Sequence, residues 1–171
     1  MAQSHELGPL IHISAEAIGQ PGQRRFRLRA IAGDGQSASL WLEKEQLNAL
    51  ADAIETVLKD EGYEHRPRAL DDLEPEPTFP LNATFDVQIA QLSMGLNRDT
   101  RHVVLIASDR ADSNESDATT VTVEFDYRRA SEFRSQARTV VSAGRPACPL
   151  CTAPMDPAGH VCVRTNGHNP H

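Results

Sequence analysis

The feature that most constrains this chain is a cluster of cysteines and histidines near its C-terminal end. All 3 cysteines of the 171-residue sequence lie in this segment. The cluster comprises Cys148, Cys151, His160, Cys162, His168 and His171. The segment between them is polar and rich in proline, so it has few apolar side chains to bury. A bound metal ion is therefore the expected source of its shape.

The spacing of the cluster predicts a zinc site. A Cys-x-x-Cys turn brings the thiolates of Cys148 and Cys151 to one ion, and Zn²⁺ takes four nitrogen or sulfur ligands in a tetrahedron. Cys162 supplies a third sulfur. His160 precedes Cys162 by two positions, so on an extended strand both side chains leave the same face. We predict a structural Zn²⁺ bound by Cys148, Cys151, His160 and Cys162, with His168 as the alternative fourth ligand.

Two other uses of these thiols stay open. A redox dithiol at Cys148 and Cys151 is expected at the start of a helix in a βαβ unit, and it leaves Cys162 and the histidines unexplained. Three unrelated thiols are the plainest alternative. A catalytic zinc needs an open coordination position and a general base in a cleft, and a short terminal ribbon with four ligands predicts neither.

Composition excludes several classes of partner. Hydrophobic residues make up 39% of the chain and charged residues 24%, which is typical of a globular protein. The formal net charge of −7 argues against broad binding to nucleic acid or to an anionic membrane. The first residues lack the pattern of a signal peptide, and no segment has the apolar length of a membrane span. We therefore expect a cytoplasmic protein without a membrane partner.

Hydrophobic periodicity predicts three strands and one helix in the first part of the chain. Apolar and polar residues alternate at 10–14, 25–30 and 37–42. Apolar residues then recur at helical spacing from Glu43 to Lys59, and Gly62 is a plausible end signal. Four prolines and several acidic residues interrupt the pattern at 63–80, which predicts a loop or linker.

The pattern of strands and then a helix returns in the second part. Alternation at 85–89 changes phase at 92–96, so we expect a bulge or strand break near Ala90. The apolar run at 102–107 predicts a central strand covered on both faces. Another half-exposed strand is expected at 121–125 and a second helix at about 128–142.

Together these elements predict an α+β fold. We expect a mainly antiparallel sheet of about six strands and two helices, arranged as a pseudo-repeat of three strands and one helix. The expected organisation is one α+β domain at 1–146, with its acidic linker near 63–80, followed by a zinc-knuckle tail at 147–171.

The second helix also predicts a basic patch on this acidic protein. Its arginines are Arg128, Arg129, Arg134 and Arg138. Such a row is either a solvated helix face or a docking face for an acidic partner or a phosphorylated ligand.

The tail resembles that of a known family. The run Arg145-Pro146-x-Cys148-Pro149-x-Cys151, followed by Asp156-Pro157-x-Gly159-His160-x-Cys162, is similar to the C-terminal end of an uncharacterised actinobacterial family of conserved hypothetical proteins. The segments 10–13 and 88–109 are also similar. The resemblance implies His160 as the fourth ligand, because a histidine at position 168 is not a fixed feature of that family. It implies no enzymatic activity.

These observations predict a zinc-binding protein that acts without catalysis, as an adaptor or regulatory protein that contacts another protein. No phosphate-binding loop, metalloprotease motif or nucleophile elbow occurs in the sequence. Two alternatives remain. One is an enzyme of unrecognised type that uses a cleft between the two α+β halves, with His102 or the arginines, and the other is a redox protein.

Overall fold

The N-terminal part of the chain folds as an antiparallel meander followed by a helix. The computed structural model describes residues 1–20, 22–110, 117–144, 148–153, 155 and 160–164. The first elements are β1 (Gln3–Ile18), β2 (Arg25–Ala32), β3 (Ser37–Leu42) and α1 (Lys44–Asp60). Glu43 and Gln46 form a capping box at the start of α1, which satisfies free N–H groups of its first turn. The predicted helix thus forms almost at the predicted bounds.

The second part repeats this order after a long connection. The connection contains one short 3-10 helix, η1 (Leu70–Asp72). It leads to β4 (Phe85–Gln88), β5 (Gln91–Asn97), β6 (His102–Ser108), β7 (Thr119–Asp126) and α2 (Tyr127–Ser142). The break expected near Ala90 is present, because β4 ends and β5 begins on either side of it.

The strands form one sheet of seven, in the order β4-β3-β2-β1-β7-β6-β5. The prediction of about six strands is corrected in number, because the sheet has seven. Four of its six strand pairings are antiparallel, as predicted, and the sheet is mixed because β1 pairs with β7 and β3 with β4 in parallel. Parallel pairing joins segments far apart in the chain, and periodicity carries no information about it.

In each half of the fold, the first strand segment pairs with a strand of the other half. β1 changes register near Gly8 and Pro9; its first part pairs with β7 and its remainder with β2. In the second half, β4 pairs in parallel with β3, while β5 pairs with β6. The chain crosses between them at Ile89 and Ala90, whose N–H groups donate to Trp41 of β3 and Ser108 of β6. Each half therefore completes the sheet of the other.

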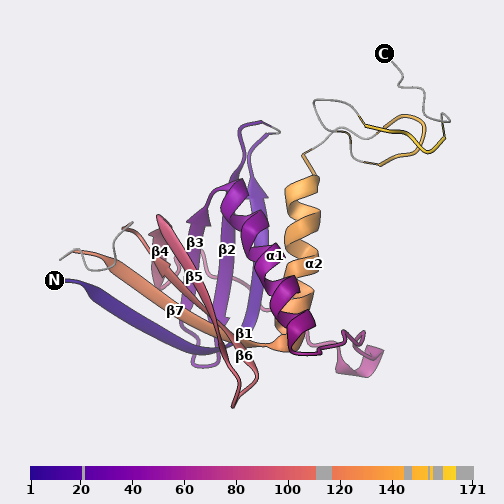
Figure 1. Cartoon of the computed structure of the whole chain (residues 1–171). Coiled ribbons are helices and arrows are strands. Elements are labelled where there is room, and N and C mark those ends of the chain that lie inside the picture. The colour runs from indigo at the N-terminus through magenta and orange to yellow at the C-terminus, as the bar shows by residue number, and fades with distance from the viewer. Residues whose placement is uncertain (21, 111–116, 145–147, 154, 156–159, 165–171) are drawn as a thin grey trace.

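Both helices lie side by side against the sheet (Figure 1). The core between them contains Leu28, Leu40, Leu47, Ile54, Leu105, Val123, Phe125 and Phe133, all at most 1% exposed. The prediction that the strand at 102–107 is covered on both faces is wrong, because Ile106 is 42% exposed. β6 is next to the edge strand β5, and none of the described helices covers its outer face.

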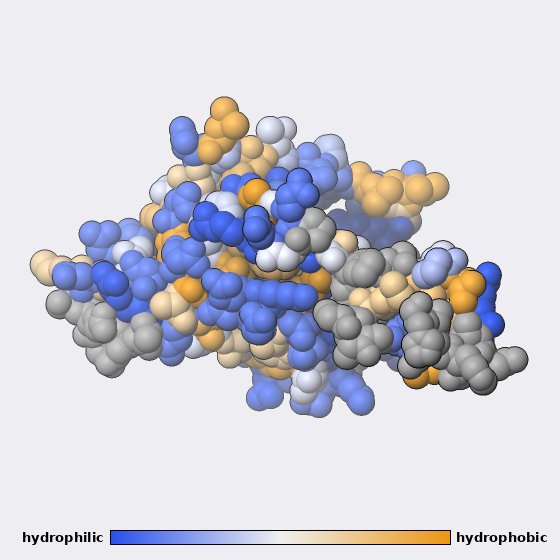
Figure 2. All heavy atoms as spheres, turned by 90° about the horizontal axis from the view of Figure 1, so that it is seen from above, coloured by the Kyte–Doolittle hydropathy of each residue, from blue (hydrophilic) through white to orange (hydrophobic). Residues whose placement is uncertain are grey.

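The surface is mostly hydrophilic in the view from above, with hydrophobic side chains in small separate groups (Figure 2). Among the described residues, neither helix combines the length and apolar character required to cross a bilayer. The tail residues lie beyond the C-terminal end of α2 (Figure 1). The domain boundary expected at 146/147 falls outside the described residues, so that division stays a prediction.

Candidate metal centre

The structure brings together the four residues predicted as zinc ligands. One ligand atom from each of Cys148, Cys151, His160 and Cys162 lies within 4.8 Å of the other three. The Cys148 and Cys162 sulfurs are 3.9 Å apart, and the Cys151 sulfur is 3.7 Å from His160 Nε2. None of the three cysteines forms a disulfide.

Two of these separations match the edges of a tetrahedron around one ion. Zn²⁺ binds sulfur at about 2.3 Å and imidazole nitrogen at about 2.0–2.1 Å. A tetrahedral angle then places two sulfurs about 3.8 Å apart, and a sulfur and a nitrogen about 3.6 Å apart. The two observed separations differ from these values by about 0.1 Å. The three thiols and one imidazole thus fit a metal ion, and the donor set is one that zinc prefers.

The Cys-x-x-Cys segment forms a hydrogen-bonded turn. The Thr152 N–H donates to the Cys148 carbonyl at 2.9 Å, and the Cys148 N–H donates to the Ala153 carbonyl at 2.9 Å. Thr152 has a φ of 62°, in the left-handed region that β-branched residues rarely adopt. The segment does not open a helix in the described chain, unlike the redox motif considered above.

The turn also favours the ligating form of one cysteine. N–H groups of Cys151 and Leu150 point at the Cys148 sulfur, and with His160 they lower the pKa of the Cys148 thiol to about 6. The pKa of Cys151 is raised. Its neighbour Ala153 donates an N–H, but burial and the two other thiols outweigh that effect. One thiolate is therefore preformed, and a cation would be needed to hold all three together.

The four residues of the cluster differ in how far they are buried. Cys148 and Cys162 are both 1% exposed, whereas Cys151 and His160 are half-buried. Three apolar side chains point outward near the ligands: Leu150 is 42%, Val161 77% and Val163 84% exposed. The alternative ligand His168 lies outside the described residues, so the choice between His160 and His168 stays a prediction.

The predicted arginine patch is largely ion-paired within the protein. Arg134 pairs with Glu55 of α1 at 3.0 Å, and Arg138 contacts both Asp52, at 2.8 Å, and Glu55. These pairs join α2 to α1. The other two arginines, Arg128 and Arg129, are half-buried, and Arg129 pairs with Asp126 at 2.6 Å. A docking role for these four side chains stays a prediction.

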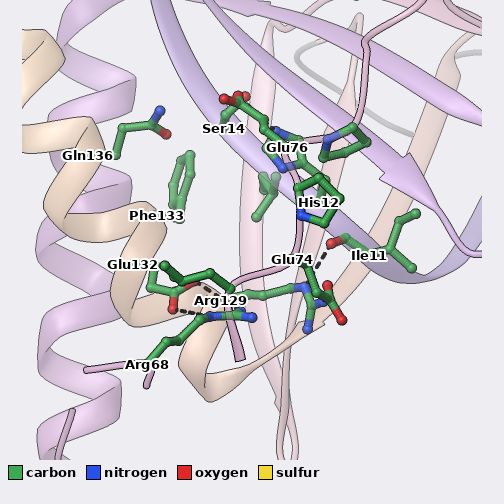
Figure 3. A pocket seen from close by; sticks show the side chains of 14 residues that line it. Ile11, His12, Ser14, Arg68, Glu74, Glu76, Arg129, Glu132, Phe133 and Gln136 are labelled. Atoms are coloured by element: carbon green, nitrogen blue, oxygen red, sulfur yellow. Dashed lines mark hydrogen bonds and ion pairs between the residues drawn. The ribbon is translucent and has the colours of Figure 1, made fainter. Parts of the chain in front are cut away.

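Sequence reasoning missed a second polar site, a hollow of about 410 Å³ between β1, α2 and residues 73–77. In Figure 3, His12 and Ser14 of β1 face Phe133 and Gln136 of α2 across it, with Arg129 and Arg68 below. Burial is the main cause that lowers the pKa of His12; Glu76 opposes it, and Arg29 and Arg129 reinforce it. His102, named in the enzyme alternative, lies instead beside Glu124, at 3.5 Å. The hollow joins three segments distant in sequence, so no local motif marks it.

The fold and the cluster define the protein's class: a mixed α+β protein with a Cys₃His centre at its C-terminal end. The chain belongs to the family described as "Protein of unknown function (DUF3090)", whose model matches residues 5–162. The match includes all four members of the cluster. No curated protein matches the chain, and no solved structure matches it. The match names no organism, so an actinobacterial origin stays a prediction.

Proposed function

We propose that this protein binds one structural Zn²⁺ through Cys148, Cys151, His160 and Cys162. The observation that carries the proposal is the agreement between the 3.9 Å and 3.7 Å separations and the edges of a zinc tetrahedron. Four protein ligands fill the coordination sphere, which is the pattern of structural rather than catalytic zinc.

The experiment is metal analysis of the purified protein by mass spectrometry, with variants that distinguish the ligands. We expect one zinc per chain in the wild type and in His168→Asn, but strongly reduced zinc in His160→Asn. Substitution by Co²⁺ adds a spectroscopic readout, because tetrahedral thiolate coordination gives intense visible absorption. Metal-free protein from zinc-replete cells would refute the proposal. Zinc loss in His168→Asn but not in His160→Asn would identify His168 as the fourth ligand in place of His160.

We further propose that the metal-bound tail is a protein-binding element of a non-enzymatic adaptor. Its support is the outward position of Leu150, Val161 and Val163 beside the ligands. Exposed apolar side chains held by a rigid turn are typical of a contact surface for another protein. Zinc would then act indirectly, by fixing the loops that carry them.

The adaptor proposal is tested by cross-linking in cell lysate with a matched control. A Val161→Ser and Val163→Ser double variant should lose cross-linked partners while keeping its zinc. Ile106→Ser is the control, because Ile106 is an exposed apolar side chain on β6, away from the tail. Identical partner profiles for all three proteins would refute a role for the tail surface.

A further inference from the structure

Among the strands that the structure describes, none pairs with one edge of β1 over its second part. β1 pairs with β7 only from Gln3 to Pro9, whereas its pairing with β2 continues to Ile18. Two side chains of α2 reach the open edge: Arg129 Nε donates to the Ile11 carbonyl at 3.0 Å, and Gln136 Oε1 accepts from the Ala15 N–H at 2.9 Å. The edge between these contacts faces the hollow of Figure 3.

The alternation of antiparallel pairing identifies the free groups on this edge. Because the Ala15 N–H points at α2, Ala15 and Leu28 form a non-hydrogen-bonded pair with β2. Ile13, two residues earlier, therefore also turns its N–H and C=O away from β2. Within the described chain these two groups make no hydrogen bond to another element. The adjacent Ser14 hydroxyl is buried, lines the hollow and has no hydrogen-bond partner among the described residues.

The hollow is at present flanked by an acidic segment of the chain itself, residues 73–77, which we call the strap. The Glu74 carboxylate lies 3.7 Å from Arg129, and the Glu76 carboxylate lies 3.9 Å from both Arg29 and His12. Both carboxylates are exposed, at 72% and 70%. Long ion pairs of this kind contribute little to stability.

The strap is also poorly suited to pair with the β1 edge. Two of its five residues are prolines, Pro75 and Pro77, which have no N–H to donate. By contrast, the floor of the hollow is held firmly, since Arg68 contacts both carboxylate oxygens of Glu132, at 2.7 and 3.3 Å. An acidic segment held by long, exposed ion pairs thus flanks a site with unsatisfied backbone and hydroxyl groups.

We propose that this groove binds an extended acidic segment of another protein, which adds as a short strand to the open edge of β1 and displaces the strap. Its backbone pairs with Ile13, and its carboxylates replace Glu74 and Glu76 at Arg129, Arg29 and His12. Residues two apart on a strand lie about 6.6 Å apart on one face, so alternate acidic residues reach Arg129 and Arg29 together. Main-chain pairing supplies affinity in this mode, and side-chain contacts supply specificity.

The test measures fluorescence anisotropy of a labelled eight-residue peptide of alternating valine and glutamate, with zinc-loaded full-length protein. The Glu74→Gln and Glu76→Gln double variant should bind it at least threefold more tightly than the wild type, because the competing carboxylates are gone. Arg29→Gln should weaken binding. Arg25→Gln is the matched control, because Arg25 lies on the same strand but contacts Gln88, outside the groove. Thermal unfolding and zinc content check that each variant is intact.

Nuclear magnetic resonance gives a second readout of the predicted pairing. The Ile13 amide proton should shift downfield and exchange more slowly with saturating peptide, whereas the Ser14 amide, which faces β2, should not. The proposal is refuted if the strap variant binds no more tightly than the wild type, if a valine–glutamine peptide binds equally well, or if the Ile13 amide is unaffected. All three results would leave the zinc proposal intact, because the groove contains none of the four ligands.

Discussion

Replacing Thr152 by glycine should tighten zinc binding. Thr152 follows the second cysteine of the turn and has a φ of 62°. The left-handed conformation costs an L-residue about 1–2 kcal/mol. Glycine avoids that cost but loses about 0.5–1 kcal/mol more conformational entropy on ordering. The net gain is therefore about 0–1.5 kcal/mol. Some of it is offset by loss of the 2.6 Å hydrogen bond from the Thr152 hydroxyl to the Cys151 carbonyl.

If zinc binds as we propose, ordering of the turn is coupled to metal binding, and this gain should appear in the metal affinity. The middle of that range, about 0.75 kcal/mol, corresponds to about threefold tighter binding before the lost hydrogen bond is counted. The assay is competition with a chromophoric chelator at fixed pH. Thr152→Ala keeps the Cβ atom and should give a smaller gain than Thr152→Gly. Thr78→Gly, at an exposed position in the long connection, is the control and should not change the affinity.

Weaker zinc binding by Thr152→Gly than by the wild type would contradict this reasoning. It would mean that the threonine side chain contributes more to the turn than its backbone strain costs. Equal gains in Thr152→Gly and Thr152→Ala would also contradict it, because the strain would then not arise from the Cβ atom.

Three further predictions concern the α+β domain and the tail. Burial and the nearby Glu61 raise the pKa of Tyr127, so the stability that the protonated phenol contributes is present below pH 10 and is lost as the pH rises further. The free energy of unfolding, measured in urea, should therefore fall less steeply with alkaline pH in Tyr127→Phe than in the wild type. Arg138→Gln removes the contacts to Asp52 and Glu55 and should lower the free energy of unfolding by about 0.5–1 kcal/mol, less in high salt. Chelation of the metal should increase amide hydrogen exchange at 148–164 and leave the amides of the sheet protected. Equal loss of protection in the tail and in the sheet would contradict the prediction that the α+β domain is stable without the metal.

Local pattern predicted the elements that a single hydrophobic face determines. The stripe that includes Leu47, Leu50 and Ile54 marks α1, and these residues are buried as expected. The phase change near Ala90 marks a real strand break. The Cys-x-x-Cys spacing predicted that Cys148 and Cys151 lie together, because that geometry is a local property of the chain, whereas the spacing left His160 and His168 as alternative ligands.

The hydrophobic pattern of the sequence failed to predict strand length and burial where these depend on the position of a strand in the sheet. The first residues of β1 are mostly polar and exposed, and they become a strand only because β7 pairs with them, so the predicted strand at 10–14 was too short. Ile106 belongs to a continuous apolar run, yet it is exposed because its strand is next to the sheet edge. The groove beside Ile13 depends on the end of the β1–β7 pairing near Pro9, which no local signal reveals.

The exchange of strand beginnings between the halves has a consequence for synthesis on the ribosome. Gln3 pairs with Thr119, and His5 with Val121, so the start of β1 has no native neighbour on that side until β7 emerges. At 5–20 residues per second, this delay lasts roughly 6–23 s. During that time the nascent chain carries an unpaired strand end, which is a natural target for chaperones or for premature association between neighbouring polysomal chains.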